Sequence, residues 1–95
     1  MTQNLVRRDG VLFRQMEDEC LLYDGDKSKV HVLNEVAGFV WEMCDGENTA
    51  RDIEQRVREV FDVPGHTRLT EDIQDCLATL TKLDLLVPLE DATSA

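Results

Sequence analysis

The fold is decided by one stretch of the sequence, Val30-His31-Val32-Leu33-Asn34-Glu35-Val36-Ala37-Gly38-Phe39-Val40-Trp41. Its first part alternates polar and apolar residues, which predicts a β-strand over 29–33. Val36, Val40 and Trp41 then recur at helical spacing, which predicts a helix with Asn34 as its N-cap. We therefore expect a strand that passes directly into a helix.

The residues before this stretch predict the rest of an antiparallel sheet. Short apolar runs at 11–15 and 20–23 are typical of strands, and the segment 24–28 (Asp-Gly-Asp-Lys-Ser) has the composition of a hairpin turn. Together with 29–33, these runs predict a three-stranded antiparallel sheet in the first third of the chain.

The residues after this stretch predict two further helices. Asp45-Gly46 ends the first helix, and Thr49 with Asp52 forms the pattern of a capping box for the second. The core face of the second helix is expected to carry Ile53, Val57, Val60 and Phe61.

A break at Val63-Pro64-Gly65 separates the second helix from the third. Thr70 is expected to cap the third helix, and Leu85-Leu86-Val87 can add a small edge strand. The inner face of the third helix is expected to carry Ile73, Leu77, Leu80 and Leu83 or Asp84.

The predicted order of three strands followed by three helices indicates the α+β fold class and outlines a winged helix-turn-helix. We expect a single domain over 1–95, with its core at about 11–87 and a frayed tail at 88–95.

Length, composition and charge narrow the possible functions. The chain has 95 residues, of which 42% are hydrophobic and 32% charged, and its net charge is -10. This charge disfavours both a phosphate backbone and an anionic membrane surface. The first eight residues hold no apolar run long enough for a signal peptide or a membrane span, so we expect a cytoplasmic protein. Cys20, Cys44 and Cys76 lack CxxC spacing and are expected to be reduced, mostly buried thiols.

No sequence pattern indicates a catalytic or metal site. His31 and His66 are 35 positions apart, and neither lies near a cysteine at zinc-like spacing. The five glycines are scattered and form no phosphate-binding loop. His31 is expected on the exposed face of its strand, and Trp41 in the core. We therefore expect no enzyme, no metal and no cofactor.

A DNA-binding regulator is the alternative that the winged helix-turn-helix leaves open. A recognition helix brings basic or amide side chains to the base edges. Over 70–84, however, the only basic residue is Lys82, against the acidic residues Glu71, Asp72, Asp75 and Asp84. This helix repels phosphate, so we expect no DNA function.

The predicted sheet offers a different kind of site. A strand at the edge of a sheet is a template for the backbone of another chain. Because strand 29–33 runs into the first helix, the packing of helices on the sheet can place a helix alongside its open edge. Such a groove accepts an extended peptide as an added strand.

The residues 30–41, followed by Cys44-Asp45-Gly46 and then Thr49 and Ile53, resemble the PqqD-like proteins, small peptide-binding domains also called RiPP recognition elements. The resemblance continues with Asp72-Ile73 and with leucines at 77, 80, 83, 85 and 86, and it covers about 11–87. It implies a winged helix-turn-helix that binds the leader of a ribosomally made precursor peptide and presents it to a modifying enzyme, often a radical SAM protein. The role implied is that of a non-catalytic peptide chaperone.

The resemblance also implies where the leader binds. In that family the leader adds as a strand beside the third strand and lies against the third helix. Carried onto this sequence, the implied peptide-binding residues are Lys29, Val30, His31, Val32 and Leu33 on the strand, and Leu69, Asp72, Ile73, Cys76, Thr79, Leu80 and Lys82 or Leu83 on the helix.

The chain departs from the family pattern at Asp84, where the family usually has glycine before the final Leu-Leu. This departure bears on the geometry of the last turn, because aspartate adopts the left-handed conformation less readily than glycine. The acidic surface suggests a leader with basic residues. The expected partners are a precursor peptide and a radical SAM or other maturase, with pyrroloquinoline quinone or another modified peptide as the product; the chain itself is a monomer or a homodimer.

Overall fold

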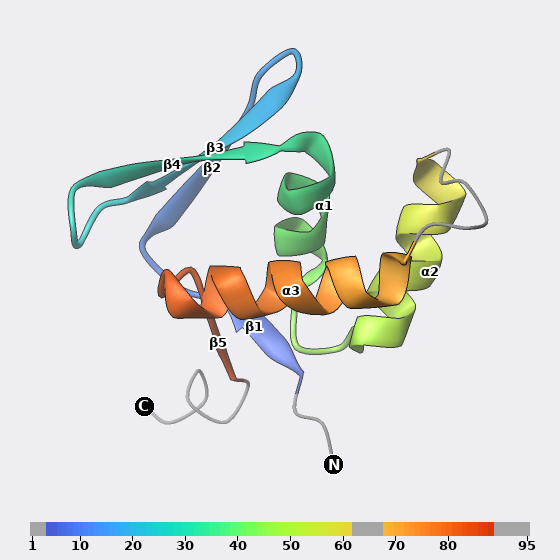
Figure 1. Ribbon diagram of the computed structural model, residues 1–95. Coiled ribbons are helices and arrows are strands. Elements are labelled where there is room, and N and C mark those ends of the chain that lie inside the picture. The colour runs from blue at the N-terminus through green and yellow to red at the C-terminus, as the bar shows by residue number, and fades with distance from the viewer. Residues whose placement is uncertain (1–3, 62–67, 89–95) are drawn as a thin grey trace.

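The computed structural model describes residues 4–61 and 68–88 (Figure 1). The elements are, in order, β1 (Leu5–Arg7), β2 (Val11–Gln15), β3 (Glu19–Asp24), β4 (Lys29–Asn34), α1 (Glu35–Met43), α2 (Ala50–Val60), α3 (Leu69–Lys82) and β5 (Leu86–Pro88). The predicted break at Val63-Pro64-Gly65 and all of the predicted tail after Pro88 lie outside the described residues. None of the helices described is long and apolar enough to span a membrane.

The predicted α+β architecture is confirmed. Strands β2, β3 and β4 form one antiparallel sheet in sequence order, and the three helices follow it. Figure 1 shows β4 passing directly into α1, while α3 crosses α1 below the sheet. The two-stranded sheet of β1 and β5 was not predicted as such: the sequence indicated only a short strand at 85–87, and β5 lies one residue further along.

Helix α1 begins as predicted and lies very close to the sheet. The Asn34 side chain accepts a hydrogen bond from the Ala37 N–H at 2.7 Å, which caps the helix. A Cβ atom at Gly38 would lie 2.3 Å from Cys20 Sγ and 2.8 Å from Cys20 Cβ. Glycine is therefore needed here for the close approach of helix and strand.

The core lies between the three-stranded sheet and the helices, and Trp41 is buried within it, as predicted. The Trp41 ring stacks on Phe13 at 5.8 Å between ring centres, and its Nε1–H donates to the Leu85 carbonyl at 3.0 Å. The other buried apolar side chains of this cluster are Leu22, Val40, Cys44, Ile53, Val57, Leu69, Ile73, Leu80, Leu85 and Leu86.

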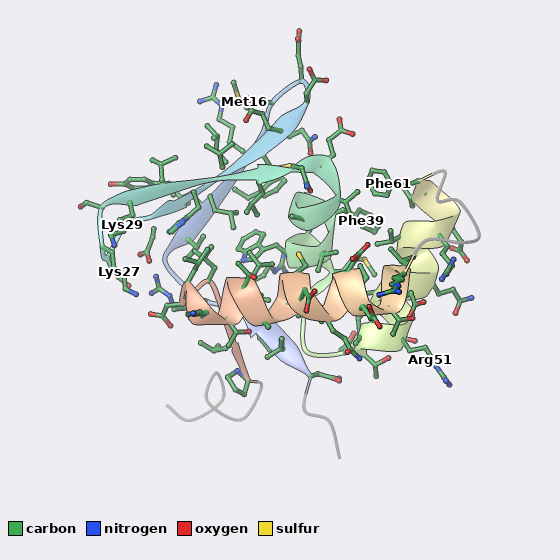
Figure 2. The ribbon with its side chains drawn as sticks, in the orientation of Figure 1. Met16, Lys27, Lys29, Phe39, Arg51 and Phe61 are labelled. Carbon is green, nitrogen blue, oxygen red and sulfur yellow. The ribbon has the colours of Figure 1, made fainter. Side chains whose placement is uncertain are left out.

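Helix α2 has the predicted capping box, because the Thr49 side chain accepts from the Asp52 N–H and the Asp52 side chain accepts from the Thr49 N–H. The prediction that Val60 faces the core is wrong: Val60 is exposed in the last turn. Phe61 is half-buried and meets Phe39 of α1 edge to face, with ring centres 5.5 Å apart (Figure 2).

The prediction that Thr70 caps α3 is also wrong. The N-cap is Arg68, which makes no side-chain capping bond. The Thr70 hydroxyl instead donates to the Glu54 carboxylate of α2 at 2.7 Å, and this bond helps to hold the pKa of Glu54 below its usual range. Thr70 therefore joins two helices rather than starting one.

Candidate functional site

Within residues 4–61 and 68–88, strand β4 has an open edge, because it is the last strand of its sheet and pairs only with β3. Two hydrogen bonds fix which backbone groups of β3 point to which neighbour. The Met16 N–H donates to the Glu19 carbonyl, and the Gly25 N–H donates to the Gly10 carbonyl. The odd-numbered residues of β3 and its extension thus bond toward β2, and in an antiparallel ladder the even-numbered ones bond toward β4.

This alternation determines which groups of β4 are available. The even-numbered residues of β3 pair with the odd-numbered residues of β4. Lys29, His31 and Leu33 therefore use their backbone groups within the sheet. Val30 and Val32 lie between them and direct their N–H and C=O groups to the open edge. The edge therefore presents two donor and acceptor pairs to an incoming strand.

The side chains of β4 alternate between the two faces of the sheet. Lys29, His31 and Leu33 share the face of the buried Leu22, which the helices cover, and His31 and Leu33 are half-buried there. The expectation that His31 lies on the exposed face is wrong, because its partner across the ladder is Leu22 rather than Tyr23. Val30 and Val32 are on the opposite face.

The residues predicted on α3 divide into two groups. Leu69, Ile73 and Leu80 are buried in the core, so they support the helix from beneath and offer almost no surface. Asp72, Cys76, Thr79 and Leu83 are exposed or half-buried. Their spacing of four, three and four residues places them along one flank of the helix.

The other flank of α3 faces β1, because Gln74 and Leu77 line a cavity together with Leu5 and Thr49. The flank made of Asp72, Cys76, Thr79 and Leu83 is therefore directed away from β1. We name these four residues the α3 flank.

A cluster of charges ties the β3–β4 hairpin to the C-terminal end of α3. Arg8 pairs with the fully buried Asp24 and donates to Asp26 at 2.9 Å, and its guanidinium also donates to the Asp84 carbonyl. Lys27 Nζ lies 3.0 Å from the Asp84 carboxylate. Hydrogen bonds between Arg8 and Asp24 raise the pKa of Arg8 and lower the pKa of Asp24. The start of β4 is thereby held beside the end of α3, with Lys27 and Lys29 at the hairpin (Figure 2).

Asp84 occupies the left-handed position that closes α3, with φ of 64°. The Asp84 N–H donates to the Thr81 carbonyl, and the Leu85 N–H donates to the Leu80 carbonyl at 2.9 Å. This is the Schellman arrangement, which usually has glycine at this position. The chain keeps that turn geometry with an aspartate, whose carboxylate is paired with Lys27.

The thiols have no features of reactive groups. Burial raises the pKa of Cys44 to about 12 and also raises the pKa values of Cys20 and Cys76, so all three are protonated near neutral pH. Among the residues described, no three His, Cys, Asp or Glu side chains are grouped so that they could hold a metal ion. What the described residues offer is a row of backbone hydrogen-bonding groups along β4, whose first residues are tied to the end of α3 through Lys27 and Asp84.

The comparison with family models decides the identity of this fold. Residues 19–86 match the model described as "Coenzyme PQQ synthesis protein D (PqqD)". The chain belongs to the PqqD family. The match runs from the start of β3 through the first residue of β5, so it includes β4 and all of α3. No curated protein matches the chain.

Solved structures share the fold of this PqqD-family chain at low sequence identity. The structure titled "TbiB1 in Complex with the TbiA(beta) Leader Peptide" is 21% identical, has a TM-score of 0.70, and covers 85% of this chain and 93% of its own. "Lasso peptide synthetase B1 complexed with the leader peptide" is 19% identical, has a TM-score of 0.72, and covers 90% and 99%. "Structure of the heterocyclase TruD" is 18% identical, has a TM-score of 0.65, and covers 93% of this chain but 12% of its own, so the fold is there one part of a longer chain.

Proposed function

We propose that this chain captures the leader of a ribosomally made precursor peptide as an extra strand on the open edge of β4, and holds it for a modifying enzyme. The observation that carries the proposal is the open edge itself, where the backbone groups of Val30 and Val32 point away from the sheet. Backbone bonding along such an edge gives affinity for an extended peptide, and side chains beside it give selectivity.

Membership of the PqqD family supports this proposal, and so do the leader peptides named in the titles of two structural neighbours. The third neighbour is named a heterocyclase, in which this fold accounts for a small part of the chain. A peptide-binding domain that works next to a modifying enzyme, either as a separate chain or as part of one, is consistent with all three.

The proposed contacts follow from the geometry. Val30 and Val32 bond to the leader backbone, while Lys29, His31 and Leu33 line the helix-facing side of the added strand. The α3 flank of Asp72, Cys76, Thr79 and Leu83 is the proposed second wall. Leu69, Ile73 and Leu80 hold that wall in place from the core.

The proposed role is binding without bond chemistry. Its benefit is a raised local concentration of the precursor at the enzyme, which replaces a bimolecular encounter by a tethered one. We propose that the enzyme is a radical SAM protein or another maturase, and that the chain works in the cytoplasm, where ribosomally made precursors are released. The product is then pyrroloquinoline quinone or another modified peptide.

A DNA-binding role is disfavoured by the exposed surface of α3. Glu71, Asp72 and Asp75 are exposed there, against Lys82 and the N-cap Arg68. A helix with this charge does not approach a phosphate backbone closely.

The proposal is tested by searching the genes beside the gene for this chain for a short precursor peptide, and then measuring fluorescence anisotropy with its labelled synthetic leader. We expect saturable binding of the leader and no competition by duplex DNA. Absence of leader binding, together with a DNA shift that weakens steeply with salt, would support the regulator instead.

A further inference from the structure

The face of the three-stranded sheet that points away from the helices is apolar and uncovered in the part of the chain that the structure describes. Leu12, Tyr23 and Val30 are direct neighbours across the three strands, and Leu21 and Val32 are neighbours in the next row, beside Arg14. Leu12, Val30 and Val32 are 68%, 58% and 59% exposed. We name these six residues the outer face.

The core does not explain the outer face, because α1 packs on the opposite side of the same strands through Gly38 and Cys20. Among the described residues there are seven exposed large apolar side chains, and four of them belong to the outer face. A contiguous apolar surface of this kind marks an interaction site more often than single exposed side chains do.

A second copy of this chain is a poor occupant for the outer face, because each copy carries a net charge of -10 and two copies repel one another. Three strands about 4.8 Å apart, with five residues at about 3.3 Å each, give a face of roughly 240 Å². A stable protein interface buries about 800 Å² on each partner, so any partner of the outer face must also contact surface beside it.

We propose that the outer face docks the enzyme that modifies the bound peptide; this inference rests on the proposed function. A leader added to β4 extends the sheet by one strand, and every second leader side chain then lies on the outer face beside Val30 and Val32. The docking surface is therefore composite, with one part from this chain and one part from the leader.

The chemistry of the outer face specifies the complementary surface on the enzyme. That surface is apolar, and it carries a carboxylate opposite Arg14, which makes no ion pair with the residues described here. Basic residues surround it, because the strongly negative domain attracts a positive rim and raises the rate of encounter.

The composite surface couples the two binding events. The enzyme contacts a larger surface when the leader is present, so it binds the loaded domain more tightly than the free domain. By thermodynamic linkage, the enzyme then raises the affinity of this chain for the leader by the same factor. The domain thus binds the enzyme while it carries the leader, and it releases the enzyme once the leader has left.

The test uses a matched pair of single substitutions, Leu12→Lys on the outer face and Val60→Lys on α2. Both residues are exposed aliphatic side chains, and Leu12 is on β2, two strands away from the leader edge. The probes are the synthetic leader and a purified modifying enzyme, both identified by the same search of the neighbouring genes. Leader affinity is measured without enzyme by anisotropy, enzyme affinity with and without leader by biolayer interferometry, and self-association by sedimentation velocity.

We expect Leu12→Lys to weaken enzyme binding at least about tenfold, as loss of an anchor residue at an interface does, while Val60→Lys changes it by less than about twofold. Both variants should bind the leader as the wild type does. The inference is wrong if Leu12→Lys binds the enzyme normally. It is also wrong if the wild type forms a dimer that Leu12→Lys abolishes and Val60→Lys does not, because the outer face then binds a second copy. Weaker leader binding by Leu12→Lys without enzyme would assign the outer face to the peptide itself. If neither the wild type nor the two variants bind the leader, the proposed function is wrong rather than this inference.

Discussion

Replacing Val32 by proline tests whether the leader adds to β4, because it removes one N–H from the open edge and no bond from the sheet. The Val32 N–H points away from β3, whereas the His31 N–H pairs with Leu22 inside the ladder. Proline is tolerated at edge positions of this kind. Val32→Pro should therefore keep the fold while it weakens leader binding.

The expected loss follows from one backbone hydrogen bond. Such a bond contributes about 1 kcal/mol net, which corresponds to about fivefold in the dissociation constant. The proline ring also projects where the added strand approaches, so we expect a total loss of about tenfold or more. The free energy of unfolding should change by less than about 1 kcal/mol, because the Val32 N–H makes no bond within the described sheet.

Two control variants separate the loss of the edge N–H from the loss of the side chain and from the loss of a hydrogen bond within the sheet. Val32→Ala keeps the N–H and removes most of the side chain, so leader affinity should change little. His31→Pro removes a bond within the sheet and leaves the carbonyl of the fully buried Leu22 without its partner, which costs about 1–3 kcal/mol of folding stability. Urea unfolding followed by circular dichroism gives the stabilities, and anisotropy with the labelled leader gives the affinities.

The reasoning is refuted if Val32→Pro folds normally and binds the leader as tightly as the wild type. In that case the leader does not use the β4 edge, and the other edge of the sheet, β2, becomes the candidate.

Four further outcomes are expected. Gly38→Ala should lower the unfolding free energy by about 1–3 kcal/mol through overpacking against Cys20, and adding Cys20→Ala should recover only part of it, because the Cys20 Cβ is itself 2.8 Å from the new methyl group. Asp84→Asn keeps a side chain that tolerates the left-handed turn but removes the charge, so its small loss of stability in urea titrations should vanish in about 1 M salt. Hydrogen bonding to Arg8 lowers the pKa of Asp24 in the folded state. The ionised carboxylate therefore contributes its full stabilisation above its unfolded pKa of about 4, and this stabilisation is lost as the pH falls through the folded pKa. Asp24→Asn should reduce the fall in unfolding free energy at acid pH. Bound leader should slow maleimide labelling of the half-buried Cys76, measured at mildly alkaline pH because burial raises the pKa of that thiol.

The sequence alone predicts the strands and helices whose stabilising contacts lie between residues close together in the chain. The strand at 29–33 alternates between polar and apolar residues, and the other two strands of its sheet are short apolar runs. The caps at Asn34 and Thr49 satisfy backbone groups within three residues. Strand β1 has only three residues, and its partner β5 is more than 70 positions away. No periodic pattern can be read from such a short strand, so this pairing depends on the assembled fold.

The candidate site was predictable as a set of elements but not residue by residue. Helical spacing places Ile73 and Leu80 on the inner face of α3, whereas the family resemblance assigns the same two residues to the peptide groove. Only their burial shows that the core uses them and that the neighbouring flank remains accessible. The α3 flank becomes recognisable only when the cavity beside β1 shows which side of the helix is occupied. In the same way, an alternating strand does not reveal whether Val32 or His31 has the free N–H, since that depends on the register with β3.

Asp84 shows how a departure from the family pattern acquires a structural role. Glycine at this position would enter the left-handed turn without strain, but it would leave Lys27 without a carboxylate beside it. Aspartate has the steric cost of a Cβ in that turn, and it gains an ion pair that ties the hairpin to α3. Because β4 begins just after Lys27 and the α3 flank ends just before Asp84, this pair sets the spacing of the two proposed walls at one end of the site. Both side chains are about half exposed, so the tie is weak and sensitive to salt, and the spacing can adjust when a peptide enters.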